Sequence, residues 1–295
     1  MKITKNLGII FVALSAILWA ISGISGQILF NEYNFSAEWL VSTRLLIAGV
    51  ILLAISKIKA PHSLFSIFKN NNDLITILFF SILGMYGVQY TYFKTIELSN
   101  ASFATTIQYT GPFFIIIYEA IKQKKFPNSK TISLMLLTLL GVFLIVSNGK
   151  FTKLTVTPLS LFWGIGSAIT LAFYSVYPRK LLKKYGSLLV VGWGMFIGSI
   201  PANMIHPFFH HLGKISQTSL LHIIFVVVLG TAVAYFLYLS SLQYISSAFA
   251  SILTAFEPIF ATLLSIPIFH TQLTFISLSG FLIVICTILL LQRVL

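Results

Sequence analysis

The chain has 295 residues, of which 57% are hydrophobic and 8% are charged. Its mean hydropathy is +0.96. Too few charged side chains remain to cover the surface of a soluble domain, so this composition excludes one and indicates a protein embedded in a lipid bilayer. The net charge of +13 comes from short basic clusters between apolar runs, a pattern that reflects membrane topology. We therefore expect membrane lipid around the chain and no nucleic acid partner.

Ten stretches are apolar over enough residues to cross a bilayer as helices. The first follows Lys2 and Lys5, but its apolar run is too long for a signal peptide, so we expect it to remain as the first span. Cys286, the single cysteine, lies in the last stretch and excludes a disulfide within the chain. The predicted spans lie near residues 7–30, 37–56, 74–94, 98–121, 131–147, 158–178, 187–205, 220–240, 246–268 and 275–292.

A duplication lies inside this pattern of helices. Residues 83–114 recur as residues 229–260 in one ungapped frame, at a constant offset of 146 (229 minus 83). Internal repeats of apolar helices are typical of secondary transporters, whose binding site lies where the two halves meet. Seven pairs are identical, namely Leu83/Leu229, Gly84/Gly230, Tyr92/Tyr238, Phe103/Phe249, Ala104/Ala250, Pro112/Pro258 and Phe114/Phe260.

Outside this region the two halves match with small changes of register. In the first and sixth helices, for example, Ser22 falls opposite Tyr174 at an offset of 152 (174 minus 22). Each half then holds five helices, an odd number, so the second half enters the membrane from the opposite side. The predicted fold is an all-α integral membrane protein with ten transmembrane helices in two inverted-topology five-helix repeats. We expect these repeats at residues 1–149 and 150–295, with residues 150–157 as the hinge between them.

Loop charges predict the orientation of the chain. Fourteen Lys and Arg residues lie in segments on the side of the N-terminus, whereas four (Lys94, Lys150, Lys153 and Lys214) lie on the opposite side. Cytoplasmic loops carry the excess of Lys and Arg. We therefore expect a multi-pass protein of the cytoplasmic membrane with both termini in the cytoplasm.

Polar residues follow one face of the fourth predicted helix. Thr105, Gln108 and Pro112 share that face by their spacing, and the ninth helix repeats the stripe with Thr254 in the place of Gln108. Such a stripe would be costly if it faced lipid, so it predicts a polar lumen. Small polar side chains in membrane helices also serve helix packing, and this alternative stays open.

Two prolines fall in the middle of apolar helices. Pro112 and Pro258 each free the carbonyl four residues earlier, at Gln108 and Thr254, and bend the helix there. We expect both prolines to act as hinges beside the cavity. A kink that the fold tolerates without contact to substrate is the alternative.

Arg44 and Glu257 are the ionisable residues nearest the middle of their predicted spans. A charge near the bilayer centre costs about 3 kcal/mol on insertion scales, so each should face the bundle interior and find a partner. They either form a buried pair with each other or act on substrate or proton. Glu257, in turn, either loads and releases a proton or stays charged to orient substrate. The candidate substrate-binding residues are Trp19, Arg44, Gln89, Tyr92, Gln108, Tyr109, Tyr174, Tyr235, Tyr238, Thr254 and Glu257.

Motifs of enzymes and cofactor sites are missing from the sequence. It has no His-Glu-x-x-His, no Gly-x-Ser-x-Gly and no phosphate-binding loop, and His210 and His211 have no nearby carboxylates. We expect no catalytic residues, no metal and no cofactor. Transport must then draw on a gradient of substrate or ion, and coupling to a proton or to a counter-substrate both stay open.

Four segments resemble a known family. They are residues 15–20 (Ser-Ala-Ile-Leu-Trp-Ala), residues 43–48 (Thr-Arg-Leu-Leu-Ile-Ala), the small-residue track of residues 101–112 and residues 256–258 (Phe-Glu-Pro). In their order and spacing they resemble the drug/metabolite transporter superfamily, in particular its EamA-type members. The resemblance covers nearly the whole chain. It implies a ten-helix inverted-repeat carrier that moves small organic metabolites, most often outward, through a cavity lined by helices one, three, four, six, eight and nine.

The sequence thus favours a secondary carrier that exports amino acids or similar amphipathic metabolites. A channel or facilitator for small solutes is the nearest alternative. A membrane-embedded transferase is the alternative from the enzymes, but it would need a catalytic acid or histidine near the lipid interface, which the sequence does not offer.

Overall fold

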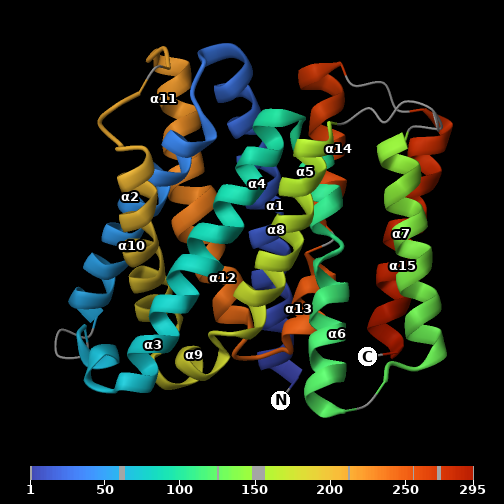
Figure 1. The fold of residues 1–295 in the computed structure, drawn as a ribbon, viewed down its shortest axis with the longest axis horizontal. Coiled ribbons are helices and arrows are strands. Elements are labelled where there is room, and N and C mark those ends of the chain that lie inside the picture. Colours follow the sequence, from blue (N-terminus) through green and yellow to red (C-terminus); the bar gives the residue numbers. More distant parts are fainter. Residues whose placement is uncertain are drawn as a thin grey trace.

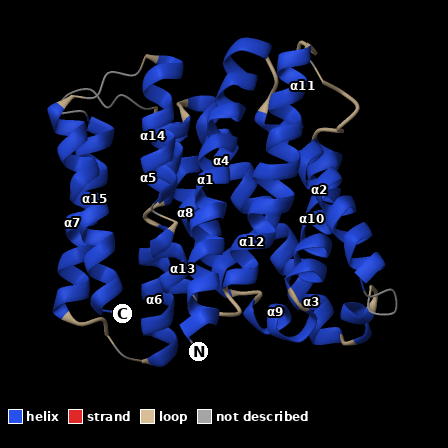
Figure 2. Ribbon diagram, turned by 180° about the vertical axis from the view of Figure 1, so that it is seen from behind, coloured by secondary structure: helices blue, strands red, loops and turns tan. Residues whose placement is uncertain are grey.

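The computed structural model describes residues 2–59, 64–124, 126–147, 157–211, 213–254, 256–270 and 274–294. This part of the chain consists of helices joined by short connections (Figure 2). Of the expected hinge, only Thr157 lies within the described residues. Its side chain accepts a hydrogen bond from the Ser160 amide and caps a helix, as hydroxyl residues commonly do.

Helices occupy all ten ranges predicted from the sequence. In the first half they are α1 (Lys2–Tyr33), α2 (Ala37–Lys59), the short 3₁₀ helix η2 (Ser66–Lys69), α3 (Asn71–Phe79), η3 (Phe80–Tyr86), α4 (Gly87–Leu98), α5 (Ala101–Gln108), α6 (Gly111–Gln123) and α7 (Ser129–Ser147). In the second half they are α8 (Pro158–Val176), α9 (Arg179–Tyr185), α10 (Ser187–Ile205), α11 (Gln217–Ile224), η4 (Phe225–Val233), α12 (Ala234–Ser241), α13 (Ser247–Leu253), α14 (Phe256–Phe269) and α15 (Phe275–Val294).

Six helical stretches of the described chain are long and apolar enough to cross a membrane. They are Lys5–Tyr33, Ala37–Lys59, Asn71–Leu98, Pro158–Val176, Ser187–Ile205 and Gln217–Ser241. The apolar helices Ser129–Gly141, Phe260–Phe269 and Phe275–Thr287 are shorter, and α5 and α6 are separated by a break. The helices therefore support a multi-pass membrane protein, whereas ten crossings remain a prediction.

The outside of the bundle presents large apolar side chains. Phe162 on α8 is 66% exposed and Leu136 on α7 is 62% exposed. Soluble monomers rarely leave wide apolar surfaces uncovered. These exposed side chains are suited to contact with the acyl chains of a lipid bilayer.

The duplication is visible in the backbone as well as in the sequence. η3 and η4 are both π-helical, and adding 146 to residues 80 and 86 gives 226 and 232, inside η4. Helices with π-type bonding are rare and frequently mark functional sites. The two halves therefore share this irregularity at the same place.

The fourth and ninth predicted spans are broken rather than kinked. α5 ends at Gln108 and α6 begins at Gly111, with the Thr110 amide donating to the Ile107 carbonyl at 3.0 Å. Pro112 stands in the first turn of α6, where its missing N–H has no partner to lose. In the second half α13 ends at Leu253 and α14 begins at Phe256. The expected mid-helix kinks are present as breaks, with each proline in the first turn of the helix that follows.

The two halves interlock through equivalent helices. α2 packs against α10, α7 packs against α15, and α1 packs against η4 and α12 as α8 packs against η3 and α4. Gly84 approaches Tyr174, and a Cβ at Gly230 would overlap Ser22. Since Ser22 and Tyr174 are repeat counterparts, each glycine faces the equivalent position of the opposite half.

Both ends of the chain lie at the lower end of the bundle in Figure 1, together with α9 and its basic residues. α2 ends at this lower end, whereas α10 begins there (Figure 1). These two helices therefore run in opposite directions.

Candidate functional site

A buried cavity lies between helices of both halves. Its volume is about 20 Å³, and its lining comes from α1, α2, α4, α5, α8, α12 and α14. These helices include all six that the family resemblance implied, and α2 in addition. The lining residues are Trp19, Ser22, Arg44, Val88, Tyr92, Phe93, Gln108, Leu171, Tyr174, Tyr235 and Glu257.

Arg44 is buried to 1% exposure and is held by the π-helical segment η4. Its Nε donates to Thr231 Oγ1 at 2.6 Å and its Nη2 donates to the Gly230 carbonyl at 3.1 Å. The guanidinium carbon stands 4.4 Å from the ring centre of Phe93, within the range of a cation–π contact. Arg44 is therefore fixed in position by neutral groups.

Glu257 stands in the first turn of α14 and is also buried. Its Oε1 accepts a hydrogen bond from the Tyr92 hydroxyl at 3.3 Å. The N-terminal end of a helix favours a negative charge. Broken helices with ends near the binding site recur in secondary transporters.

Arg44 and Glu257 line the same cavity but do not form an ion pair. The ion pairs within the described chain join Lys94 to Glu38, Lys94 to Glu97 and Lys184 to Asp73. The structure therefore contradicts the alternative of a buried Arg44–Glu257 pair, because Thr231, Gly230 and Phe93 hold the guanidinium and Tyr92 holds the carboxylate.

The rings of Trp19, Tyr174 and Tyr235 form an aromatic wall of the cavity, and Tyr238 packs behind them. The Trp19 ring lies 5.0 Å from Tyr235 and 5.2 Å from Tyr238, and Tyr174 lies 5.6 Å from Tyr235 (centre to centre). The Tyr238 hydroxyl pairs with Ser175 at 2.9 Å. Tyr238 therefore supports the other rings rather than lining the cavity.

Seven of the eleven candidates line the cavity and four do not. Gln89 is fully buried beside the lining residue Val88, and neither its amide oxygen nor its nitrogen has a partner among the described residues. Tyr109 and Thr254 are buried at the ends of α5 and α13. Tyr238 stands behind the wall.

Sequence reasoning missed four lining residues: Ser22, Val88, Phe93 and Leu171. Ser22 was recognisable as the repeat counterpart of Tyr174. Phe93 lies four residues after Gln89, on the same helix face. Val88 and Leu171 carry no signal that separates them from ordinary apolar helix residues.

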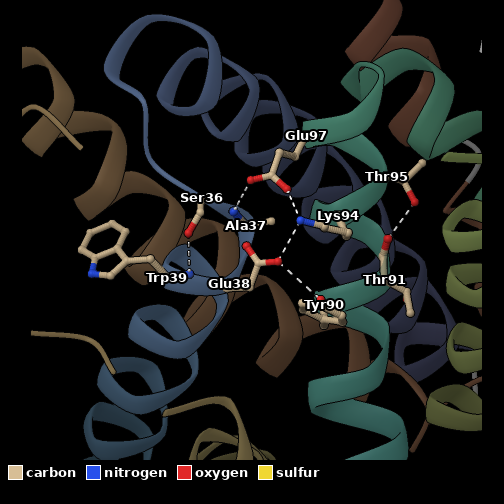
Figure 3. Close-up of polar contacts among 9 residues, drawn as sticks. All are labelled: Ser36, Ala37, Glu38, Trp39, Tyr90, Thr91, Lys94, Thr95 and Glu97. Carbon is tan, nitrogen blue, oxygen red and sulfur yellow. Dashed lines mark hydrogen bonds and ion pairs between the residues drawn. The ribbon is translucent and has the colours of Figure 1, made fainter. Parts of the chain in front are cut away.

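A second polar cluster, Glu38, Lys94 and Glu97, lies where α2 begins and α4 ends (Figure 3). Lys94 Nζ stands 2.8 Å from Glu38 Oε1 and 2.6 Å from Glu97 Oε2. Glu97 also accepts from the Ala37 amide at 2.9 Å (Figure 3). The cluster ties the start of α2 to the end of α4.

The second half has a neutral version of this cluster. Adding 146 to 94 and 97 gives Ser240 and Gln243, and both contact Ser187 at the start of α10. Ser240 Oγ lies 2.7 Å from Ser187 Oγ, and Gln243 Nε2 donates to Ser187 Oγ at 2.9 Å. Equivalent helices are thus connected in each half. Charged side chains connect α2 to α4, and uncharged side chains connect α10 to the end of α12.

Comparison with known proteins agrees with this arrangement. A model of the EamA-like transporter family matches residues 6–147 and residues 158–293, once in each half. A crystal structure of a protein with 14% sequence identity superimposes with a TM-score of 0.71, over 99% of both chains. At that identity the likeness shows the fold alone.

Two curated relatives are transporters. The chain is 35% identical over 288 residues to YicL, an uncharacterized inner membrane transporter of Salmonella typhimurium, covering 97% of this chain and 95% of the relative. It is 25% identical over 278 residues to an uncharacterized transporter of Clostridium kluyveri, covering 88% of this chain and 84% of the relative. The chain therefore belongs to the EamA-like transporter family, as a multi-pass transporter of the cytoplasmic membrane and not an enzyme.

Proposed function

We propose that this protein is a secondary active transporter that exports amino acids or similar amphipathic metabolites by alternating access. The observation that carries the proposal is the buried cavity between the halves, which combines Arg44, Glu257 and an aromatic wall. Duplicated transporters bind substrate at the interface of their repeats. An apolar wall beside two charged groups suits a molecule with an apolar part and a charged part.

The size of the cavity favours a carrier over a channel. At about 20 Å³ it has room for about one water molecule, whereas ligand pockets usually measure about 300–1,000 Å³. Substrate can enter only if the surrounding helices move apart. The breaks between α5 and α6 and between α13 and α14 are places where such a movement can occur, with Pro112 and Pro258 as the proposed hinges.

The proposed topology has ten crossings in two inverted repeats, residues 1–149 and 150–295, with both termini in the cytoplasm. The antiparallel course of α2 and α10 supports it (Figure 1). So does the position of the basic residues of α9 at the end that holds both termini. A gradient of substrate, counter-substrate or protons would supply the energy.

Counterflow in proteoliposomes tests the proposal. Vesicles loaded with an unlabelled amino acid should accumulate the labelled compound transiently, with a rate that saturates. The screen should compare aromatic, aliphatic and polar amino acids, with protein-free vesicles as the control. A flux that rises linearly with concentration, without stimulation from the opposite side, would favour a channel instead.

A further inference from the structure

Four polar atoms around the cavity have no hydrogen-bond partner among the described residues. They are Trp19 Nε1, Ser22 Oγ, Arg44 Nη1 and the Tyr174 hydroxyl. All four side chains line the cavity and are at least nine-tenths buried. Native proteins seldom leave buried polar atoms unpaired, so each one needs an explanation.

All four of these groups can donate a hydrogen bond. The indole N–H of Trp19 and the guanidinium N–H groups of Arg44 can only donate, and the hydroxyls of Ser22 and Tyr174 can donate as well. A ligand that satisfies all four must therefore offer several acceptor lone pairs. A carboxylate does so with two oxygens and a negative charge.

The surroundings of Arg44 also favour the binding of an anion. Its other two nitrogens are held by Thr231 and the Gly230 carbonyl, both uncharged, and no described carboxylate stands within ion-pair distance of it. Removing a cation from water without a counter-charge is costly. Gly230 brings η4 against Ser22, so the Ser22 hydroxyl and the Arg44 guanidinium are held close to the same glycine.

We propose that Trp19, Ser22, Arg44 and Tyr174 form the binding site for a carboxylate group of the transported molecule, with Arg44 as its anchor. This assignment rests on the proposed transport function and adds the chemical group that the cavity selects. The aromatic wall receives the apolar part of the same molecule. Chloride would satisfy the same donors and is separated from a carboxylate by the experiment.

Three probes with one ring and different head groups test the assignment: phenylacetate, phenylacetamide and 2-phenylethylamine. Binding to the purified protein in nanodiscs should be measured by calorimetry, in buffers with and without chloride. We expect phenylacetate to bind at least about tenfold more tightly than phenylacetamide, because only the carboxylate offers Arg44 a charged hydrogen-bond acceptor. The amine reports whether Glu257 binds a cation in the same cavity. Equal affinity for phenylacetate and phenylacetamide would overturn the assignment. Saturable chloride binding without phenylacetate binding would also overturn it.

Substitutions that remove one donor test the same point within the protein. Tyr174→Phe deletes only the hydroxyl and should weaken phenylacetate binding about tenfold without changing phenylacetamide binding. Tyr118→Phe, at a residue that is 48% exposed, is the matched control and should change neither. If Tyr174→Phe lowers the yield of folded protein, phenylacetate binding should be measured for Ser22→Ala instead. Ser279→Ala is then the control and should leave the affinity unchanged. Unchanged phenylacetate affinity in a folded donor variant contradicts the proposal.

Transport of the same probes separates this proposal from the proposed function. Counterflow of a neutral solute that Tyr174→Phe does not affect would retain the carrier and overturn the carboxylate site. Tight phenylacetate binding that depends on Arg44 and Tyr174, in a protein without counterflow of any solute, would support the site and overturn the carrier.

Discussion

Arg44 and Gly194 occupy equivalent positions in the two halves of this protein. α2 and α10 begin 150 residues apart, at Ala37 and Ser187, and 44 plus 150 is 194. Arg44 bonds Thr231 on η4, while a Cβ at Gly194 would lie 3.2 Å from Met85 on η3. Met85 and Thr231 are themselves repeat counterparts. Both halves therefore make a contact at the same place, but with different side chains. The first half has the cation Arg44 at this position, and the second half has Gly194, which packs closely against η3.

The duplication therefore provides a symmetric frame for an asymmetric site. The ionic cluster around Lys94 and its neutral counterpart around Ser240 repeat this asymmetry away from the cavity. In the proposed alternating access, the symmetric backbone would allow the cavity to open toward either side. The differences in side chains would then decide what binds and which end is held more firmly.

The proposed topology predicts a labelling pattern. In a Cys286→Ser background, Lys57→Cys and Lys183→Cys should be shielded from impermeant thiol reagents in intact cells, whereas Lys214→Cys should react. The reason is that the first two positions lie on the strongly basic side, which is expected to be cytoplasmic. All three should react after the cells are opened. Labelling of Lys183→Cys from outside would exclude the proposed orientation.

Gln108 and Tyr238 should respond differently to replacement by leucine. Gln108 lines the cavity, so Gln108→Leu should reduce counterflow about tenfold or more with near-parental thermal stability. Tyr238 packs behind the wall and pairs with Ser175, so Tyr238→Leu should lower stability by about 2–4 kcal/mol. Counterflow and thermal unfolding of the same preparations check both. Equal loss of folded protein in the two variants would indicate that Gln108 serves packing.

Glu257→Gln tests whether the carboxylate orients substrate or carries a proton. The change preserves size, and the amide oxygen can still accept the hydrogen bond from Tyr92. We expect counterflow to fall about tenfold or more while thermal stability changes by less than about 1 kcal/mol, because a charged contact to substrate is lost. Transport should be measured with and without an imposed pH gradient. If counterflow stays intact and only the response to the gradient disappears, Glu257 is a proton carrier instead.

The Lys94 cluster should stabilise its end of the bundle more than its neutral counterpart does. Lys94→Met leaves Glu38 and Glu97 near each other without a cation, and since their side chains are 21% exposed we expect a loss of about 1–2 kcal/mol. Ser240→Ala should cost about 1 kcal/mol or less. Thermal unfolding of the purified variants checks this order. The double variant Glu38→Gln/Lys94→Met should recover part of the loss, and no difference between it and Lys94→Met would show that repulsion is unimportant.

Much of the architecture could be predicted from the sequence because the signals are local. A run of apolar residues reports a membrane helix wherever it lies, and the 146-residue offset pairs Pro112 with Pro258 without any knowledge of contacts. The family membership followed from the same short motifs. Helix spacing also singled out Gln108 and Tyr92, since residues seven apart share a face, and both line the cavity.

Other features were decided only by the tertiary structure. Spacing shows which residues share a helix face, but the rotation of that helix against its neighbours decides whether the face meets a cavity or another helix. This is why Tyr238 lies behind the wall and Tyr235 lines it. In the same way, the amino-acid sequence by itself determined that Arg44 and Glu257 face the interior. The π-helical turn of η4, which presents Thr231 and the Gly230 carbonyl to Arg44, decided that these two charges stay apart.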